Sequence, residues 1–552
     1  MAVICSAAAC SRGSDFIGYA CGLPPPLPAV TTNPWNCGFR CFVDENLAGL
    51  PGGPMPLFAR PTDSSPGAQP KIVYPLPGSM HPLNLGGIDL QWKRGGGGSQ
   101  AYFRLRVVAA TDPALAYTLY LPCRAPPPIP SPPAVEECTY PINRALWTTI
   151  AADNPDGEID LVVAGTDPAG TTIAESPAVR IAFGPSSVKG GIYYWSSDGQ
   201  GIFRALLGGG AGQSFIAPPV AGVFPCGGCH SVSHDGRVLA FSGERNAYSQ
   251  DGTLAVVAVA TPSPTLVGPA RGTGGDGATM TLNRDGSLVL VSYGSTSDPG
   301  HVVVRETATG RQLARRDPDP GAPGAGRIFF PEWSPDGHEI AATVSSGSMR
   351  PWIVTGGSIA VLSYGAGALG APRVVVPQDD AAGLFHFYPT WSPDGVWIAF
   401  VSAPLPGPSY GNPQSRLRLV RRAGGRVYEL AQATQGVGKT STYPKFAPVM
   451  QDQCSVLYLT FNSKMDYGLL LKNSLAGAAP QPQLWMTAID LRALASGDPS
   501  RPPVWLPFQQ TQQSNLLGAW TARIVCSAQS DCGPATTATC DSALGECVPT
   551  LP

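Results

Sequence analysis

Charged residues are scarce in this chain. Asp, Glu, Lys and Arg make up 13% of its 552 residues, and the formal net charge is -2. No polybasic run is present, so the sequence predicts no binding to nucleic acid. No apolar run is long enough for a transmembrane helix. We find no H-E-x-x-H motif and no paired carboxylates in a repeated context, and we expect no nucleophile elbow and no enzymatic activity.

Disorder is excluded by the apolar content, although the chain is rich in residues that interrupt regular structure. The 66 Gly and 59 Pro together exceed a fifth of the chain, whereas hydrophobic residues reach 43%. This combination is typical of a turn-rich all-β protein. Length alone predicts two or three domains.

Fourteen cysteines point to an oxidising compartment, because a reducing cytosol does not favour their accumulation. Residues 525–552 form a Cys-rich tail with almost no apolar core, so we expect two disulfides, of undetermined pairing, to hold it. Cys123 and Cys138 flank a Pro-rich stretch and are predicted to bridge its ends. The tail cysteines are Cys526, Cys532, Cys540 and Cys547.

Residues 1–20 resemble the end of an export signal, because they hold a short apolar run. The alanines before Cys10 are similar to a lipobox, in which Cys10 would carry lipid and tether the protein to a membrane; an ordinary N-terminal segment is the alternative. Residues 21–69 are predicted to be a Pro/Gly-rich linker with a local disulfide loop between Cys37 and Cys41. We expect a monomer in the bacterial periplasm, associated with the outer membrane, or outside the cell.

Residues 70–185 contain successive strand-like segments bounded by Gly, Pro or Asp. They include IDLQWKR, AYFRLRVVAA, AYTLYL and GEIDLVVAGTD. Their spacing is typical of a β-sandwich, and the segment resembles an immunoglobulin or fibronectin type III domain. We expect a spacer or docking module, since no cluster of His, Ser or carboxylate side chains lies in it.

A repeat organises residues 191–524. Four copies align on an Asp-Gly pair that recurs at intervals of about fifty residues, and a degenerate fifth copy spans residues 444–463. Each copy predicts a short inner strand, a tight turn in which Gly adopts positive φ, and an apolar strand. Because one unit cannot bury both faces of its sheet, the units must stack in a ring. The four aspartates are Asp235, Asp285, Asp336 and Asp394.

The phrase Trp-Ser-Pro-Asp-Gly, at residues 333–337 and 391–395, is followed in both places by an apolar strand. It resembles the TolB-type (PD40, WD40-like) β-propeller family. The resemblance covers about residues 191–520 and implies blades around a central channel. Residues 191–209 have strands but no preceding inner strand, so residues around 516–524 are expected to complete this unit and close the ring. Five repeat units and this composite one predict six blades.

The first Asp-Gly copy is preceded by Cys226-Gly-Gly-Cys229-His230, the C-x-x-C-H pattern of covalent c-type haem attachment. Two thiols at this spacing add to the two vinyl groups of a haem, and the next residue is held beneath the iron. A histidine there becomes an iron ligand through a neutral nitrogen. The alternatives are a disulfide between the two cysteines or half of a zinc site.

A second iron ligand is predicted from the register of the repeat. Counted back from the Asp-Gly pair, Met280 occupies in the next copy the position that His230 has in its own. Equivalent positions on neighbouring inner strands are expected to face a shared funnel, so Met280 is the first candidate, with core packing as the alternative. His386 is the second candidate. Its alternative role is that of a histidine at the channel rim whose hydrogen bonds are satisfied by neighbouring groups.

The sequence thus predicts an all-β chain, a six-bladed propeller preceded by a β-sandwich and followed by a disulfide-stapled tail. The main hypothesis for function is an exported monohaem c-type cytochrome that transfers electrons or senses redox state at the cell envelope, with an unknown redox or envelope protein as partner. The alternative is a TolB-like scaffold that binds a protein or peptide, without haem and with a disulfide between Cys226 and Cys229.

Overall fold

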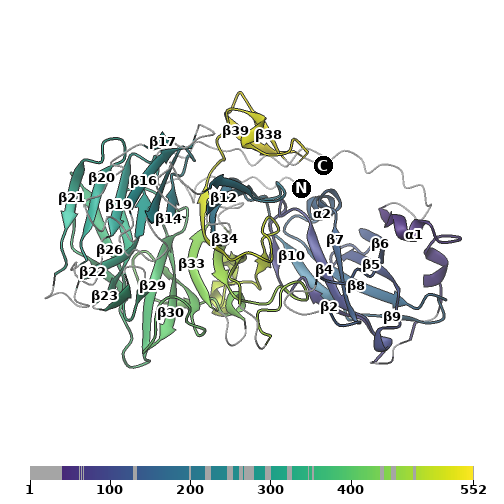
Figure 1. Ribbon diagram of the computed structural model, residues 1–552. Helices are drawn as coiled ribbons and strands as arrows, with labels where there is room; N and C mark the ends of the chain where they lie inside the picture. Colours follow the sequence, from purple (N-terminus) through teal and green to yellow (C-terminus); the bar gives the residue numbers. More distant parts are fainter. Residues whose placement is uncertain are drawn as a thin grey trace, which may run out of the picture.

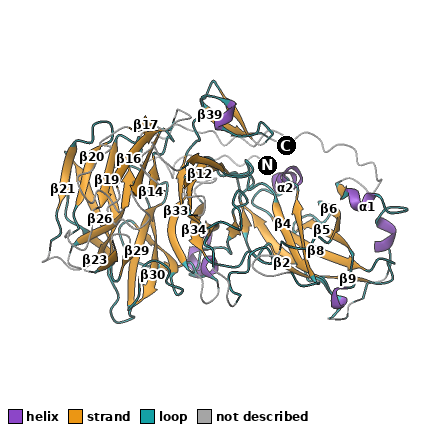
Figure 2. Cartoon of the chain, viewed as in Figure 1, coloured by secondary structure: helices purple, strands orange, loops and turns teal. Residues whose placement is uncertain are grey.

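The computed structural model describes residues 40–550, with internal gaps, and most of its regular structure is β-strand (Figure 2). In Figure 1 two bodies lie side by side, residues 40–188 and residues 191–521, with a small C-terminal hairpin beside them. No helix in the described ranges is long and apolar enough to cross a membrane. The residues not described are 1–39, 61, 64, 66, 128–132, 198–200, 218–225, 245–252, 260–264, 267–278, 293–299, 320–325, 346, 351–352, 436–439, 449–454, 476–479, 537 and 551–552.

The first body contains a seven-stranded sheet and a three-stranded sheet. The larger sheet has the order β1-β6-β5-β8-β10-β3, with β9 paired to β8, and the smaller has the order β2-β4-β7. Trp92 on β4 and Phe103 on β5 are fully buried with ring centroids 5.0 Å apart, so the two sheets pack against each other. The elements are β1 (Cys41–Val43), β2 (Lys71–Tyr74), β3 (Met80–His81), β4 (Ile88–Lys93), β5 (Tyr102–Ala109), β6 (Ala116–Pro122), β7 (Glu137–Ile142), α2 (Arg144–Ala152), β8 (Glu158–Thr166), β9 (Ile173–Glu175) and β10 (Val179–Phe183).

The structure differs from the linker prediction after residue 40. β1 pairs in parallel with β6, and Asp44 caps the short helix α1 (Glu45–Ala48). Leu47 and Phe58 are buried with Tyr120 in one apolar cluster. A few apolar side chains thus anchor this segment to the first body despite its Gly and Pro content, whereas Cys10 and Cys37 lie outside the described residues.

The second body consists of six antiparallel sheets, which we number 1 to 6 along the ring. Sheet 1 is β13-β12-β11-β37, and sheets 2, 3, 5 and 6 are β14 to β17, β18 to β21, β29 to β32 and β33 to β36. Sheet 4 is β22-β23-β26-β27, with β28 also paired to β26. The innermost strands β37, β14, β18, β22, β29 and β33 each contact the next, and β33 contacts β37, so the ring is closed. This arrangement is that of a β-propeller.

The strands of the ring have the following bounds. They are β11 (Gly191–Ser196), β12 (Gly201–Leu206), β13 (Gln213–Ile216), β14 (Cys226–Val232), β15 (Val238–Glu244), β16 (Thr253–Ala258), β17 (Thr265–Leu266), β18 (Thr279–Leu282), β19 (Leu288–Ser292), β20 (Val302–Glu306), β21 (Gln312–Arg316), β22 (Arg327–Trp333), β23 (Glu339–Ser345), β26 (Ser358–Gly365), β27 (Ala368–Leu369), β28 (Arg373–Val376), β29 (Leu384–Trp391), β30 (Trp397–Pro404), β31 (Arg416–Arg421), β32 (Tyr428–Glu429), β33 (Ser441–Phe446), β34 (Val456–Ser463), β35 (Gln483–Asp490), β36 (Val504–Trp505) and β37 (Asn515–Thr521). A separate hairpin of β24 (Ser348–Arg350) and β25 (Ile353–Val354) follows β23.

The Asp-Gly pairs form the turns after the innermost strands. In sheet 4 the Ser334 hydroxyl donates to the Asp336 carboxylate over 2.6 Å and accepts a backbone N–H across the turn over 2.9 Å. Gly337 has a φ of 74°, a left-handed conformation that glycine adopts without strain. The same serine bonds recur at Ser233 and Ser392. The predicted tight turn with Gly at positive φ is therefore confirmed.

The tryptophan of the repeated phrase joins neighbouring sheets. Trp333 donates its indole N–H to the carbonyl of Thr281 over 3.2 Å, and Trp391 donates to the carbonyl of Glu332 over 3.0 Å. Each acceptor lies on the innermost strand of the preceding sheet, and both indoles are buried. The two tryptophans thus hold adjacent sheets in register as well as filling the space between them.

The ring closes where the sequence predicts. β37 pairs antiparallel with β11, with Thr521 opposite Gly191 and Asn515 opposite Ser196. The expected completion of the first unit by residues around 516–524 is confirmed. One sheet therefore joins two segments that are more than half the chain apart.

The bridge predicted between Cys123 and Cys138 and the two disulfides predicted in the tail are present. Cys123 is bonded to Cys138 at the ends of the Pro-rich stretch. The tail forms the hairpin β38 (Ala538–Asp541) and β39 (Glu546–Pro549), and its two disulfides pair alternate cysteines. These bonds are Cys526–Cys540 and Cys532–Cys547.

The two bodies share an interface. A segment between β34 and β35 lies on the smaller sheet of the first body, where the Tyr467 hydroxyl donates to the Asp89 carboxylate over 2.9 Å. Nearby, Lys472 Nζ is 2.7 Å from the Glu137 carboxylate. Apolar residues of both bodies also belong to one continuous buried cluster. The bodies are therefore held together by a common core and by partly buried polar bonds.

We expect Asp89→Asn to stabilise the protein at neutral pH by about 1 kcal/mol, the scale of one buried polar group. Burial raises the pKa of Asp89 above its usual value. The ionised form is therefore disfavoured in the folded state, and stability is lost as pH rises through the folded pKa. Asparagine still accepts from Tyr467 but carries no charge. Urea unfolding at pH 7 and near pH 3 checks this, because the gain should vanish at the lower pH.

The matched control is Asp160→Asn in the same body. Asp160 is more exposed, and its ion pair with Arg180 lowers its pKa. This variant should gain no stability at pH 7. If both variants change the free energy of unfolding equally at pH 7, the Asp89 carboxylate at the interface does not cause the gain in stability.

Candidate functional site

The C-x-x-C-H stretch forms β14, the innermost strand of sheet 2. The pairing of β14 with β15 shifts between Gly228 and His230, so Cys229 is an extra residue at a bulge. The side chains of Cys226 and Cys229 lie outside the described part of the structure. Haem attachment to these two cysteines and a disulfide between them therefore both stay predictions.

His230 points toward sheet 1. Its side chain is buried, and Nε2 lies 3.0 Å from the backbone carbonyl of Tyr193 on β11. A carbonyl only accepts, so Nε2 carries a proton and donates it to Tyr193. Burial, with a smaller contribution from the charge of Lys445, lowers the pKa of His230 to about 4 against the opposing effect of the Tyr193 hydrogen bond, so the ring is neutral at pH 7.

Met280 lies in a different interface. It is buried in an apolar cluster with Ala240, Leu254 and Val256, which belong to strands of sheet 2. His230 thus lies between sheets 1 and 2, and Met280 between sheets 2 and 3. The expected convergence on one funnel is not found in the described contacts. The reason is that this register position directs each side chain toward the preceding sheet, so equivalent residues enter successive interfaces.

His386 also has its own local partners. On β29, its Nδ1 lies 2.8 Å from the Ser402 hydroxyl, and its ring packs edge-on against Phe400 at 5.5 Å. Its backbone N–H donates to the carbonyl of Gly357. Burial lowers the pKa of His386 to about 4. These contacts are those of a satisfied core histidine, and none of them is shared with His230.

The described residues do not assemble a haem site around His230. An iron–imidazole bond needs open space at the ligating nitrogen, but Nε2 faces a main-chain carbonyl 3.0 Å away. The other nitrogen, Nδ1, is buried without a hydrogen-bond partner in the described contacts. The contacts of His230 therefore do not fit those of a haem ligand.

One ion pair spans the inside of the ring. Lys445 on β33 is hydrogen-bonded to Glu332 on β22, although β29 lies between these two strands in the ring. Their side chains are 28% and 23% exposed, so solvent reaches this part of the channel. The equivalent positions of the other four innermost strands carry no charge. These positions are Ala519, Ser231, Thr281 and Thr390.

Three aromatic residues form an arc two positions before this pair along their strands. Phe330, Tyr388 and Tyr443 have φ values of 50°, 54° and 50°, a left-handed conformation that costs a non-glycine residue about 1 kcal/mol or more. The ring centroids of Phe330 and Tyr388 are 4.4 Å apart, and those of Tyr388 and Tyr443 are 4.3 Å apart. Backbone strain of this kind concentrates at functional sites. We call these three residues the aromatic arc.

Sequence reasoning missed the aromatic arc, although a signal was available. In three copies an aromatic residue directly precedes proline, as Phe330-Pro331, Tyr388-Pro389 and Tyr443-Pro444. Residues before proline avoid the right-handed helical region, and here they adopt the left-handed one at a strand bulge. Tyr443 is half-buried, whereas Phe330 and Tyr388 are buried.

A G-x-S-x-G pattern also occurs, at residues 407–411, contrary to the expectation from the sequence. Ser409 is fully buried in the connection between β30 and β31. Its hydroxyl accepts the backbone N–H of Val354 over 3.1 Å and lies 3.4 Å from the Tyr388 hydroxyl. No described histidine contacts it, and no helix follows it. The geometry is that of a structural serine that fixes a loop beside the aromatic arc.

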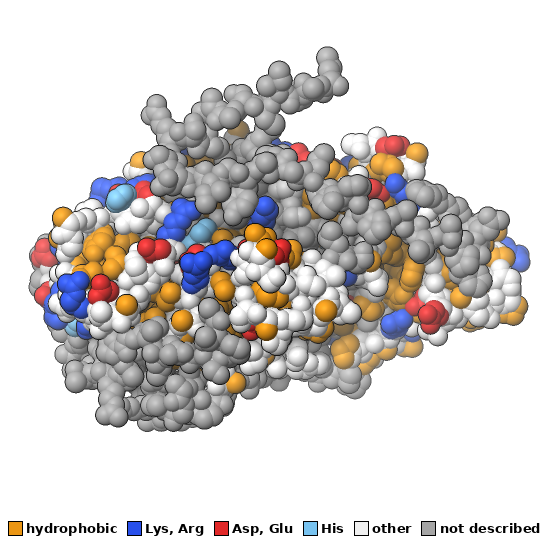
Figure 3. All heavy atoms as spheres, turned by 90° about the horizontal axis from the view of Figure 1, so that it is seen from above, with side chains coloured by type: hydrophobic (Ala, Val, Ile, Leu, Met, Phe, Trp, Pro, Cys, Tyr) orange, Lys and Arg blue, Asp and Glu red, His pale blue; other side chains and the backbone are white. Residues whose placement is uncertain are grey.

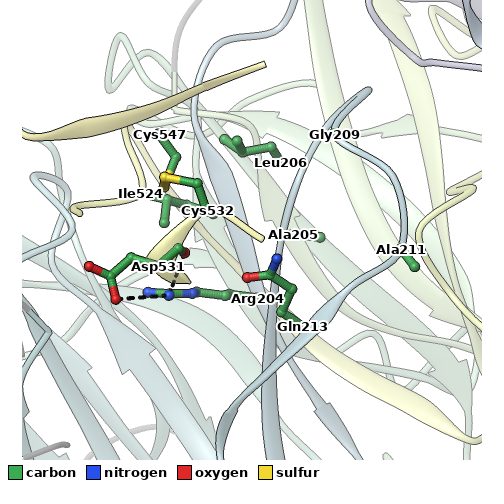
Figure 4. A pocket seen from close by; sticks show the side chains of 10 residues that line it. All are labelled: Arg204, Ala205, Leu206, Gly209, Ala211, Gln213, Ile524, Asp531, Cys532 and Cys547. Carbon is green, nitrogen blue, oxygen red and sulfur yellow. Dashed lines mark hydrogen bonds and ion pairs between the residues drawn. A yellow bond between two sulfur atoms is a disulfide. The ribbon is translucent and has the colours of Figure 1, made fainter. Parts of the chain in front are cut away.

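Figure 4 shows a small pocket between sheet 1 and the tail. Arg204 donates to the backbone carbonyl of Asp531, and its guanidinium is 3.8 Å from the Asp531 carboxylate. The Cys532–Cys547 disulfide forms another part of the wall. Because its charged groups are already paired, this pocket serves to dock the tail.

On the face seen in Figure 3, basic and acidic side chains are interspersed.

Comparison with known proteins gives structural neighbours only. No protein-family model matches the chain, and no curated protein matches it either. Among solved structures, a TolB from Agrobacterium tumefaciens described as putative is similar over 62% of this chain and 95% of that chain (TM-score 0.35, 16% identity). TolB from Acinetobacter baumannii is similar over 66% and 79% (TM-score 0.40, 12% identity). The β-propeller domain of the Trilobed protease from Pyrococcus furiosus is similar over 60% and 79% (TM-score 0.30, 11% identity). The neighbours are thus TolB and β-propeller proteins, at identities that say nothing of ligand or activity.

Proposed function

We propose that the six sheets are the blades of a six-bladed, TolB-like β-propeller, that the first body is an immunoglobulin-like β-sandwich, and that the chain is a binding scaffold for a protein or peptide. The observation that carries this function is the aromatic arc beside the Glu332–Lys445 pair. Tyr443, the half-buried member of the arc, is the ring that we expect a ligand to contact, and the buried Tyr388 packs against it. Rigid aromatic rings bind at low entropic cost and are common anchors in recognition sites. A partly exposed ion pair next to them offers charged groups for a polar end of the ligand.

The proposal extends to location and partners. The disulfides favour an oxidising compartment, and we place the protein in the bacterial periplasm. We propose a monomer whose partner is an envelope protein and not nucleic acid, and that it has no catalytic activity of its own. A membrane tether through Cys10 is part of this proposal and concerns a residue outside the described ranges.

Peptide selection on the whole protein tests the binding function. Peptides enriched by phage display should bind the wild type in solution. Tyr443→Ala should lower their affinity at least tenfold, because truncation of an aromatic anchor that the ligand covers costs roughly 2 kcal/mol or more. Tyr428→Ala is the matched control, since Tyr428 is a half-buried tyrosine on the outermost strand of sheet 5. Equal loss in both variants, or undiminished binding by Tyr443→Ala, would rule out the aromatic arc as the site.

Haem-dependent electron transfer is the second candidate, and the Cys226-x-x-Cys229-His230 sequence is the observation that favours it. In this reading the two thiols would hold haem c, His230 would be an iron ligand, and Met280 or His386 would be the second one. The contacts of all three side chains count against this set. A pyridine haemochrome spectrum of protein matured in the periplasm distinguishes the two functions.

A further inference from the structure

Sheet 1 is the seam of the ring, because it joins the two ends of the propeller chain. β37 must find β11 after more than 300 intervening residues, and no covalent bond in the described residues links the two strands. The pairing is irregular at its centre. Leu517 has a φ of 55°, and the register shifts between Tyr193 and Trp195. The innermost strand pairs of sheets 2, 4, 5 and 6 have a similar shift, but only in sheet 1 does the innermost pair join strands that are not consecutive in the chain.

His230 contacts the seam at this irregularity. Its Nε2–H donates to the carbonyl of Tyr193, the residue at which the β11–β37 register shifts. No equivalent residue of the other five innermost strands has a side chain that donates a hydrogen bond. These residues are Met280, Pro331, Pro389, Pro444 and Gly518. The donor is therefore particular to the sheet that follows the seam.

The turn after β14 contacts the far end of the closing strand. The Thr521 hydroxyl lies 3.0 Å from the carbonyl of His234, and the backbone N–H of Ala522 donates to the same carbonyl over 2.8 Å. Arg523 Nε donates to the carbonyl of Asp235 over 3.1 Å. The approach is close, because a Cβ added to Gly236 would lie 2.3 Å from the Arg523 carbonyl oxygen.

We propose that the segment from His230 to Gly236 is a clasp that fastens the closing strand of the ring, and that His230 serves as a hydrogen-bond donor to the seam instead of as a haem ligand. The clasp holds sheet 1 at two points: Tyr193 in the middle of the irregular ladder, and residues 521–523 where the strand ends. The clasp itself consists of the end of β14 and the turn after it, so it belongs to sheet 2, the next sheet along the ring. Losing either point should loosen the seam locally before the remaining sheets are affected.

Hydrogen exchange at pH 7 on the full chain tests the clasp through two matched pairs of variants. Gly236→Ala and Gly337→Ala impose the same backbone strain, because the native φ values are 72° and 74°. Only the Cβ of Ala at position 236 would collide with the residues that follow the closing strand. We expect Gly236→Ala to speed exchange in β11 and β37 at least tenfold relative to Gly337→Ala. His230→Leu should do the same, whereas His230→Gln, which keeps an N–H donor, should restore protection.

Any of the following outcomes would overturn the proposal. The first is equal seam exchange in the two glycine variants. The second is a glutamine variant as unprotected as the leucine variant, or a loss spread evenly over all six sheets. The third is covalent haem with His230 on its iron in protein matured by a host with c-type cytochrome machinery. If His230→Leu fails to fold, the glycine pair and His230→Gln decide the question.

Discussion

A chain truncated after Ser514 is expected to fail to fold its ring. This truncation removes β37, the innermost strand of sheet 1. It leaves one edge of β11 unpaired and removes the strand that β14 and β33 pack against where the ring closes. It also removes Trp520, which is buried in the core shared by both bodies. Exposed edges and apolar faces of this size lead to aggregation. Expression, solubility and circular dichroism of the purified chain measure the effect.

Truncation after Val525 is the matched control. This chain keeps β37 but lacks most of the tail, including both tail disulfides. We expect it to fold, with a stability reduced by the docking contacts of Arg204 and Asp531. If the chain that ends after Ser514 is soluble and fully folded, β37 is not required to close the ring.

Trp391→Ala is expected to destabilise the ring by about 3–5 kcal/mol, the usual cost of deleting a buried tryptophan. Trp391 fills the apolar cluster between sheets 4 and 5, and its N–H bonds to Glu332 on the preceding sheet. Arg422 also lies over its ring at 5.5 Å. Denaturant unfolding, monitored at more than one wavelength, gives the change in free energy of unfolding.

Trp391→Phe separates the two roles of the indole. It keeps most of the apolar volume but leaves the Glu332 carbonyl without its donor, so a loss of roughly 1–3 kcal/mol is expected. If alanine and phenylalanine cost the same, volume is not the dominant contribution. If alanine costs less than about 1 kcal/mol, this residue does not join the two sheets.

The repeat was predictable because its signal is local. Ser334, Asp336 and Gly337 bond within a few residues of one another, so the phrase alone indicates the turn. The closing strand was also predictable, because a first unit without an inner strand requires one from elsewhere in the chain. The bridge between Cys123 and Cys138 follows from the Pro-rich loop that they enclose.

The pairing within the tail was not predictable, because four cysteines allow three connectivities that spacing does not distinguish. The Glu332–Lys445 pair joins strands from non-adjacent sheets, which no local pattern reports. The segment after residue 40 was assigned to a linker from its composition, although Leu47 and Phe58 are enough to anchor it.

Alignment of the repeats gives the register of His230 and Met280 correctly, but it does not give the interface that each side chain enters. The two residues do occupy equivalent positions on adjacent innermost strands. Equivalent positions share an orientation relative to their own sheet, however, and around a ring this orientation points to a different neighbour each time. His230 therefore contacts Tyr193, whereas Met280 contacts residues of sheet 2.

The most direct test of a binding scaffold without haem is the covalent state of Cys226 and Cys229. The protein should be matured in the periplasm of a host that attaches c-type haem, then digested without reduction and measured by mass spectrometry. We expect the peptide with both cysteines to carry no haem and to become two mass units heavier on reduction of its disulfide. A peptide that carries the mass of haem, together with a haemochrome spectrum, would contradict it.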